Sequence, residues 1–320
     1  MQHLNVIVDA MSRQGEGNIA IKLVAASGEK LPEWQAGAHI DVHLPNNIVR
    51  QYSLTGHPQQ SCYLICVKKE SLSRGGSKFI HEQLRIGQTL KISLPRQAFP
   101  LLPAQHHIFM AAGIGITPIL AMLETLEAQQ QPFQLFYYVK QPQHVAFAER
   151  WLQGFQYGQC SILCSEHGQS ARHQLPECLH SPQANQRLYL CGPESFMLHC
   201  QDSALQLNWQ QDQIHLEAFA PMQQHTVNHQ QTIFTVKLSS TGQCFDIPED
   251  RTIAQVLIEH DINVPLSCEM GMCGACLTRV YTGEVDHQDT VQTEDEKNAV
   301  DQFIALCCSR AKSAMIEIDL

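Results

Sequence analysis

The sequence predicts a multidomain protein with an antiparallel β-barrel, an α/β domain built on a parallel sheet, and a small C-terminal β-grasp domain. Three observations lead to this fold class. Residues 1–102 hold short alternating strands, residues 103–221 alternate strands with helices, and residues 232–320 run hairpin, helix, cysteine-rich loop and final strand. A chain of 320 residues has room for two or three domains of about 100–150 residues each.

The first segment has the pattern of half-buried strands. We expect strands at 19–24, 38–44 and 62–67, where apolar and polar residues alternate or apolar residues run together. Turn-forming residues separate them, at 45–47 and 56–58. Several short strands between tight turns are typical of a small antiparallel barrel.

The second segment changes to the alternation of a parallel sheet. A buried strand is expected at 108–112 and a helix at 119–126, joined by a glycine turn at 113–118. Further strands are expected at 133–139 and 187–191. This order indicates a parallel sheet with helices on both faces.

The third segment follows a polar stretch, 222–231, which we expect to be a linker. A hairpin is expected from 234–238 and 244–247, then a helix capped by Thr252, and a final strand at 315–320. Small β-grasp ferredoxin folds have this order of elements.

Five cysteines of the third segment have the spacing of metal ligands. Cys268-x4-Cys273-x2-Cys276 is followed roughly thirty residues later by Cys307 and Cys308, the pattern of a plant-type [2Fe–2S] cluster held by four thiolates. A zinc site normally uses two ligand pairs, so the grouping of three plus one argues against zinc. Only one of Cys307 and Cys308 can complete the set.

The composition restricts the class of protein. No apolar run approaches the ~18 residues of a membrane span. Thirty-one acidic against 21 basic residues give a net charge of −10, which argues against nucleic-acid binding and favours a basic protein partner. The N-terminus lacks the apolar stretch of a secretory signal, so we expect a cytoplasmic protein with reduced thiols.

A candidate phosphate-binding site begins at Arg50-Gln51-Tyr52-Ser53-Leu54, expected at the end of the second barrel strand. Gly75-Gly76-Ser77 follows, before an expected helix at 78–84. Glycine-flanked N–H groups at a helix start bind phosphate well. Taken alone, an Arg–Tyr pair at a strand end is more often a surface ion pair beside a core aromatic residue. In this order, before a glycine loop and a nucleotide domain, Arg50 to Ser53 resemble the R-x-Y-S motif of ferredoxin-reductase-type flavoproteins, and this resemblance implies a flavin.

The glycine turn of the second segment indicates a nucleotide site. Gly113-x-Gly115-x-Thr117-Pro118 differs from the usual dinucleotide fingerprint, but it places glycines between a strand and a helix. Thr117 is expected to cap the helix and Pro118 to be its first residue. An ordinary strand-to-helix turn is the alternative interpretation. Such turns at the carboxyl edge of a parallel sheet are where these folds bind nucleotides.

Two further loops support a nicotinamide nucleotide. Cys191-Gly192-Pro193 again ends a buried strand in a small-residue turn, and Ser165-Glu166 follows another strand. A glutamate there accepts from a ribose hydroxyl and repels a 2′-phosphate, which favours NADH. A nearby arginine leaves NADPH open.

With these motifs in this order, the whole chain resembles the phthalate dioxygenase reductase family, which includes vanillate demethylase and carnitine monooxygenase reductases. The resemblance implies FMN rather than FAD. It also implies that Arg50 pairs with the flavin phosphate, that Tyr52 packs on the isoalloxazine, and that Ser53 bonds near N5. Cys307 then completes the cluster, because it occupies the ligand position of the family's C-x-S-R-A pattern.

The same resemblance implies the remaining site residues. Ser53, Cys191 and Phe219 take the positions beside the reacting rings, with Cys191 as a positioning residue. The other expected cofactor contacts are Gln51, Val67, Lys68, Gly75, Gly76, Ser77, Gly113, Gly115, Thr117, Pro118, Ser165, Glu166, Gly192 and Pro193.

The expected function is electron transfer from NADH through FMN and the [2Fe–2S] cluster to a Rieske-type terminal oxygenase. An FAD-containing reductase of a di-iron hydroxylase and a redox sensor are the alternatives. The acidic residues beside the cluster are either a solvated face or a transient docking surface for a basic oxygenase patch. They are Glu284, Asp286, Asp289, Glu294, Asp295, Glu296 and Asp301.

Overall fold

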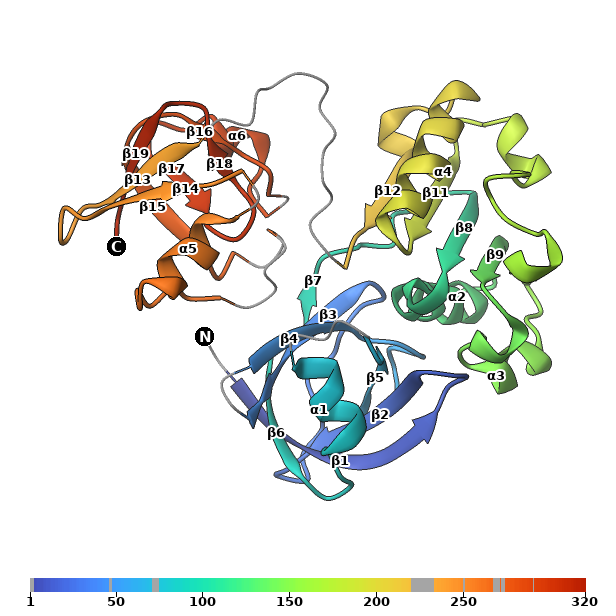
Figure 1. Cartoon of the computed structure of the whole chain (residues 1–320). Coiled ribbons are helices and arrows are strands. Elements are labelled where there is room, and N and C mark those ends of the chain that lie inside the picture. Colours follow the sequence, from blue (N-terminus) through green and yellow to red (C-terminus); the bar gives the residue numbers. More distant parts are fainter. Residues whose placement is uncertain are drawn as a thin grey trace. The chain divides into compact units, whose positions relative to one another are not determined.

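The computed structural model describes residues 3–45, 48–70, 75–219, 233–249, 251–266, 271, 274–289 and 291–320. The chain divides into two compact units, Met1–Phe219 and Ala220–Leu320 (Figure 1). Among the described helices, none has the length and apolar character needed to span a membrane. The expected linker at 222–231 lies outside the described residues.

The first unit begins with the antiparallel barrel that the sequence predicts. Its strands pair in the order β4-β3-β6-β1-β2-β5, and β7 pairs with β3. Helix α1 (Gly76–Glu82) packs against both terminal strands of this path, β4 and β5. The strands are β1 His3–Arg13, β2 Asn18–Ala25, β3 Ala38–Leu44, β4 Ile48–Ser53, β5 Tyr63–Lys68, β6 Thr89–Ser93 and β7 Arg96–Gln97.

One expectation for the barrel is wrong. Arg50 to Ser53 lie on β4, the fourth strand of the chain, and not on the second strand. The sequence prediction missed β1, whose exposed polar residues interrupt the apolar pattern, and it did not separate β4 from β3.

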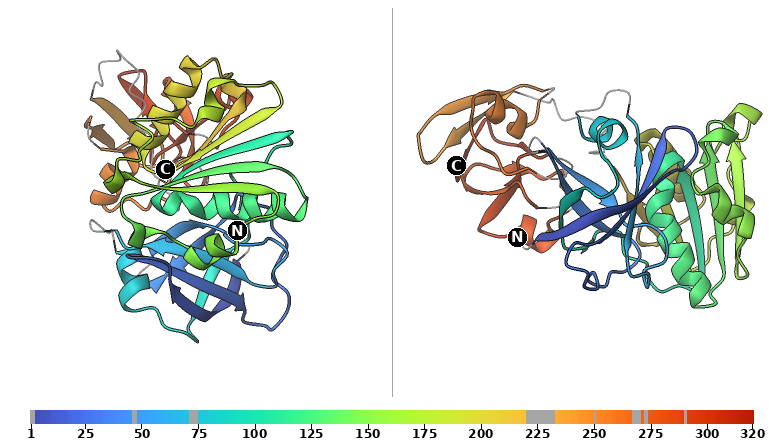
Figure 2. Two further views of the ribbon diagram at one scale, coloured as in Figure 1. Left: turned by 90° about the vertical axis from the view of Figure 1, so that its right-hand side faces the viewer. Right: turned by 90° about the horizontal axis from the view of Figure 1, so that it is seen from below.

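The first unit continues with a five-stranded parallel sheet in the order β10-β9-β8-β11-β12. Figure 2 shows α2 on the face of this sheet toward the barrel and α4 on the other face. The strands are β8 His106–Ala112, β9 Phe133–Val139, β10 Gly158–Cys164, β11 Gln186–Cys191 and β12 Ile214–Glu217. The α-helices are α2 Ile116–Ala128, α3 Ala148–Gln153 and α4 Glu194–Gln206. The 3-10 helices are η2 Gly113–Gly115, η3 Pro142–His144, η4 Ser165–His167, η5 Glu177–His180 and η6 Gln211–Gln213.

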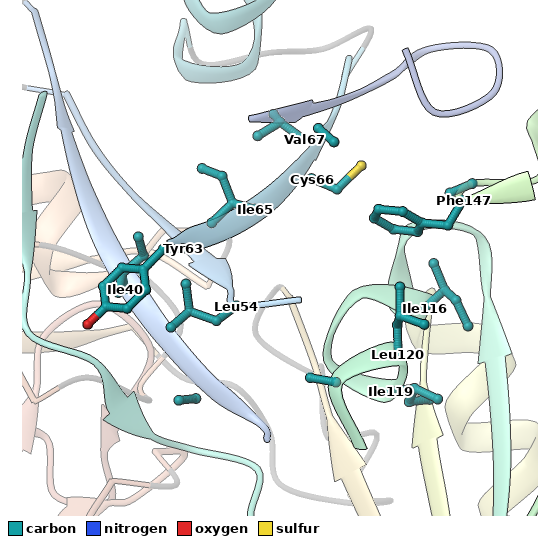
Figure 3. Close-up of a cluster of buried hydrophobic side chains, with 14 of the residues drawn as sticks. Ile40, Leu54, Tyr63, Ile65, Cys66, Val67, Ile116, Ile119, Leu120 and Phe147 are labelled. Atoms are coloured by element: carbon teal, nitrogen blue, oxygen red, sulfur yellow. The ribbon is translucent and has the colours of Figure 1, made fainter. Parts of the chain in front are cut away.

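A single hydrophobic core joins the barrel to the parallel sheet. Figure 3 shows barrel side chains facing those of α2, with Phe147 beside them. Burial of apolar surface stabilises such a contact by about 25 cal/mol per Å². The barrel and the sheet are therefore one packed body. The residues in this contact include Leu54, Ile65, Val67, Ile116, Ile119 and Leu120.

The second unit is a mixed five-stranded sheet in the order β14-β13-β19-β15-β17, with β13 and β19 parallel. A separate pair is formed by β16 and β18. The strands are β13 Phe234–Leu238, β14 Cys244–Ile247, β15 Leu277–Thr282, β16 Val285–Asp286, β17 Gln302–Ala305, β18 Arg310–Ala311 and β19 Met315–Ile318. The helices are α5 Ile253–Glu259, which Thr252 caps as predicted, and α6 Glu294–Lys297.

Candidate functional site

The strand β4 and the start of α1 lie together at the position where the sequence predicts a phosphate site. The Arg50 side chain lies against Gly76, where a Cβ atom would stand 2.7 Å from Arg50 Cγ. Only glycine at 76 therefore lets the guanidinium stem pass beside the first turn of α1. Ser77 Oγ accepts from the Glu70 N–H at 3.2 Å. A cation beside glycine-flanked helical N–H groups has the donor set of a phosphate site.

Tyr52 and Ser53 complete the end of β4. Tyr52 lies opposite Ile40 of β3, and burial raises the pKa of its hydroxyl, which stays protonated. Ser53 is buried, and its Oγ donates to Glu217 Oε2 at 3.4 Å. The hydrogen bond connects the barrel to the last strand of the parallel sheet.

Glu217 is a site residue that the sequence analysis missed. It ends β12 and is 3% exposed, and burial raises the pKa of its carboxyl to about 8, while the Ser53 hydrogen bond opposes the shift. In the sheet register it lies beside Cys191 of β11. The only signal in the sequence was an acidic residue at the end of an apolar strand, close to Phe219.

Cys191 is buried at 0% exposure at the carboxyl end of β11. Burial, and then the neighbouring Glu217, raise the pKa of its thiol well above the ordinary value. The thiol is therefore neutral at physiological pH, which fits a positioning role and excludes a thiolate nucleophile.

The glycine turn after β8 lies against the backbone of Cys191. A Cβ atom on Gly115 would stand 2.3 Å from the Cys191 carbonyl oxygen, so the two backbones touch there. Strands β8 and β11 are neighbours, and the chain continues from β8 to β9 on one side and returns to β11 on the other. This is the topological switch point at which open α/β sheets bind ligands.

The capping roles expected in this turn are wrong. The chain is already helical at η2, and α2 begins at Ile116, so Thr117 and Pro118 are its second and third residues. The Thr117 hydroxyl donates back to the Ile114 carbonyl at 3.0 Å. Pro118 still lies in the first turn, where its missing N–H costs no hydrogen bond.

The remaining predicted contacts lie at the edges of the site. Ser165 and Glu166 form η4 after β10; the Ser165 hydroxyl donates to the Val139 carbonyl at 3.2 Å, and Glu166 is exposed. Gly192 and Pro193 lead from β11 into α4.

On the barrel side, Gln51 Nε2 is buried and has no hydrogen-bond partner among the described residues. Val67 is buried, and Lys68 forms a surface ion pair with Glu70 at 3.0 Å. Phe219 is 37% exposed at the end of the first unit.

Two of the four predicted cluster ligands lie in the described residues. Cys276 and Cys307 are both buried, and their sulfur atoms are 3.3 Å apart. The Gly271 N–H donates to Cys307 Sγ at 3.2 Å. Cys308 is partly buried, with its sulfur 4.0 Å from the Ala305 carbonyl oxygen. Cys268 and Cys273 lie outside the described residues.

The acidic stretch near these cysteines is less uniform than the sequence suggested. Asp289 is 3% exposed and does not belong to the surface, because it is hydrogen-bonded inside the fold. Asp301 is exposed and forms an ion pair with Arg279. Glu284 and Glu296 are exposed. The side chains of Glu294 and Asp295 lie outside the described residues.

Comparison with known proteins finds relatives that match both units of the chain. Residues 236–312 match a family described as a 2Fe-2S iron-sulfur cluster binding domain, and residues 95–214 match the N-terminal domain of dimethylamine monooxygenase subunit DmmA-like proteins. The chain is 42% identical over 320 residues to a vanillate O-demethylase oxidoreductase from Pseudomonas sp., covering 99% of this chain and 100% of the relative.

Two solved structures are similar to the whole chain. Phthalate dioxygenase reductase, described as a modular structure for electron transfer from pyridine nucleotides to [2Fe–2S], is 34% identical with a TM-score of 0.72, covering 99% of this chain and 98% of that one. An intact type IV self-sufficient cytochrome P450 monooxygenase is 32% identical with a TM-score of 0.78, covering 99% of this chain and 41% of that one. The chain therefore belongs to the phthalate dioxygenase reductase family of oxidoreductases.

Proposed function

We propose that this chain is the reductase component of a two-component oxygenase, passing electrons from NADH through FMN and a [2Fe–2S] cluster to a Rieske-type terminal oxygenase. The observation that carries the proposal is the meeting of Ser53, Glu217 and Cys191 where the barrel contacts the carboxyl edge of the parallel sheet. A flavin bound there accepts a hydride and releases its electrons singly, which is the chemistry the cofactor supplies.

The barrel residues hold the flavin at both ends. Arg50 and the N–H groups of 75–77 bind one phosphate, which fits FMN. Tyr52, with its protonated hydroxyl, supplies an aromatic face to the ring. Gln51 Nε2, which has no hydrogen-bond partner in the part of the chain that the structure describes, is a further donor available to the bound cofactor.

The parallel sheet holds the nicotinamide nucleotide. Gly113 and Gly115 let the diphosphate approach the backbone, and Gly192 and Pro193 flank the nicotinamide beside Cys191. The exposed Glu166 accepts from a ribose hydroxyl and repels a 2′-phosphate, so the chain prefers NADH. Phe219 would stand beside the flavin face.

Glu217 and Ser53 form a proton-holding pair next to the hydride path. A carboxyl with a pKa of about 8 keeps its proton at neutral pH and holds the Ser53 hydroxyl in place. The pair therefore fixes the Ser53 side chain beside the expected flavin position without placing a buried negative charge there.

The second unit passes electrons out of the protein. Cys268, Cys273, Cys276 and Cys307 hold the cluster, and the oxygenase docks on this unit. The thiolate ligands fit a cytoplasmic location. The similarity to a P450 monooxygenase favours a second candidate acceptor, a cytochrome P450 haem in place of a Rieske centre.

The test is an anaerobic NADH titration of the purified protein, followed by its visible spectrum. We expect both the flavin bands and the cluster absorbance to bleach, with about three electrons taken up. NADPH should bleach the protein far more slowly at equal concentration. If NADH bleaches neither chromophore when both are present, the reductase proposal fails and the redox-sensor alternative gains support. Extraction of FAD in place of FMN would favour the di-iron hydroxylase reductase.

A further inference from the structure

Asp289 differs from every other acidic residue of its stretch for which the structure describes a side chain. It follows β16 and precedes α6 in the chain, and its side chain is completely buried, with 0% exposure. A carboxylate out of water must be paired or hydrogen-bonded, otherwise its burial costs several kcal/mol. The hydrogen-bond partners of Asp289 therefore indicate which parts of the chain this carboxylate holds in place.

Asp289 is the centre of a small buried network. Oδ1 accepts from the Ser309 hydroxyl at 3.2 Å and from Gln292 Nε2 at 3.1 Å, and Oδ2 accepts from the Gln292 backbone N–H at 3.1 Å. His287 Nδ1 lies 3.5 Å from Oδ1. These contacts tie residues 287–289 to Gln292 and to Ser309.

Val291, the residue before Gln292, is hydrogen-bonded to Gly271 at the predicted cluster site. The Val291 N–H donates to the Gly271 carbonyl at 3.1 Å, and the Gly271 N–H donates to Cys307 Sγ at 3.2 Å. Ser309, the hydroxyl partner of Asp289, follows Cys307 by two residues. Hydrogen bonds and the short backbone links between them thus connect the buried carboxylate to a predicted ligand sulfur.

We propose that Asp289 is a positioning residue of the iron–sulfur site, which holds Val291 and Gln292 so that the Gly271 N–H stays on the Cys307 sulfur. The inference rests on the proposed function, since it requires that Cys307 ligates the cluster. Hydrogen bonds to cluster sulfurs set the reduction potential, because they stabilise the more negative reduced state.

The two effects of removing Asp289 have opposite signs. Loss of a negative charge near the cluster raises the reduction potential. Loss of the N–H donor to sulfur lowers it. A merely electrostatic role and a positioning role therefore predict shifts in different directions.

The experiment compares the full-length wild type with Asp289→Ala, and with Asp246→Ala as a matched control. Asp246 is an exposed carboxylate of the same unit that also accepts from a hydroxyl, that of Thr235 at 2.8 Å. Iron content and the EPR signal of the reduced protein establish the cluster, and an EPR-monitored titration gives its midpoint potential. We expect Asp289→Ala to lower the potential enough to change the electron-transfer equilibrium about tenfold, ~59 mV for one electron. Asp246→Ala should leave it unchanged.

The outcomes separate the two proposals. A wild type with neither iron nor the EPR signal contradicts the proposed function itself. A wild type with the cluster, and an Asp289→Ala variant with full iron and an equal or higher potential, overturns the positioning role. If Asp289→Ala does not fold, Ser309→Ala decides in its place, because it removes one partner of Asp289 and keeps the charge. A lower potential in Ser309→Ala supports the proposal, and an unchanged potential overturns it.

Discussion

At the scale of single residues, burial decides what the carboxyl and thiol groups of this protein can do. Glu217 and Asp289 are both about as buried as core leucines, yet they differ in their partners. Asp289 has several donors, whereas Ser53 Oγ is the one hydrogen-bond partner of the Glu217 carboxyl among the described residues. Several donors compensate the burial of Asp289, whereas Glu217 keeps a proton beside the predicted hydride path.

The pH dependence of stability should reveal Glu217. Because its pKa rises from 4.5 to about 8 on folding, the folded state holds a proton that the unfolded state releases. Its stabilising contribution is therefore present below pH 4.5 and is lost as pH rises through about 8, with a slope of at most about 1.4 kcal/mol per pH unit. Glu217→Gln should flatten this decline.

The measurement is urea unfolding followed by tryptophan fluorescence between about pH 5 and 8. All tryptophans, Trp34, Trp151 and Trp209, lie in the first unit and report on it. The exposed Glu177→Gln should keep the wild-type slope. A Glu217→Gln variant with that same slope would show that the carboxyl is ionised in the folded protein.

Substitution of the adjacent cysteines tests which of them is the fourth ligand. The sulfur atoms of Cys307 and Cys276 are 3.3 Å apart, as neighbouring ligands of one cluster would be. The Cys307→Ser variant should therefore lose most of the cluster absorbance and most of the iron. Cys308→Ser should keep both. Iron analysis and visible spectra of the two purified variants provide the measurement, with flavin content as the internal control. Equal losses in the two variants would mean that either thiol can serve.

At the scale of elements, the sequence analysis identified regular structure better than contacts. The strands β9, β13 and β14 begin and end where the apolar patterns predicted, because period-two alternation and flanking turns are local signals. The Ser53–Glu217 bond joins residues 164 positions apart, and no local pattern encodes it. Likewise, Asp289 read as one acid among many, since only tertiary packing shows that it is enclosed.

The turn between β8 and α2 has no room for a side chain at 115. In Gly115→Ala the added Cβ would stand 2.3 Å from a backbone oxygen of the neighbouring turn, so one of the two must move. We expect a loss of about 1–3 kcal/mol in stability and a large rise in the NADH concentration needed for flavin reduction. Ala128→Gly, at the exposed end of the same helix, should cost about 0.5–1 kcal/mol and leave NADH use unchanged. Stopped-flow flavin reduction at varied NADH separates the two; normal NADH dependence in Gly115→Ala would place the nucleotide elsewhere.

At the scale of the whole molecule, the chain is two units, and the first holds both predicted cofactor-binding domains as one body. The segment that connects the barrel to the parallel sheet is fixed by a side chain of the sheet. Tyr189 of β11 accepts from the Leu102 N–H at 2.7 Å and donates to the Pro100 carbonyl at 3.2 Å. Its ring also packs edge-on against Phe99, with centroids 5.3 Å apart. The strand that presents Cys191 thus also holds the connection to the barrel.

Tyr189→Phe should therefore weaken the coupling between the two cofactor sites. It removes the acceptor of the Leu102 N–H and the donor to the Pro100 carbonyl, which costs about 0.5–1.5 kcal/mol for each hydrogen bond, and it frees the connection between the barrel and the parallel sheet. We expect slower flavin reduction at saturating NADH, with an unchanged cluster potential. Tyr63→Phe is the matched control, because its hydroxyl donates to the Pro32 carbonyl at 2.6 Å within the barrel and holds no connection. Both variants should lose stability in urea, but only Tyr189→Phe should slow hydride transfer in a stopped-flow experiment. Equal rates in the two variants would mean that the hydrophobic core alone, and not the hydrogen bonds of the Tyr189 hydroxyl, holds the barrel in place against the parallel sheet.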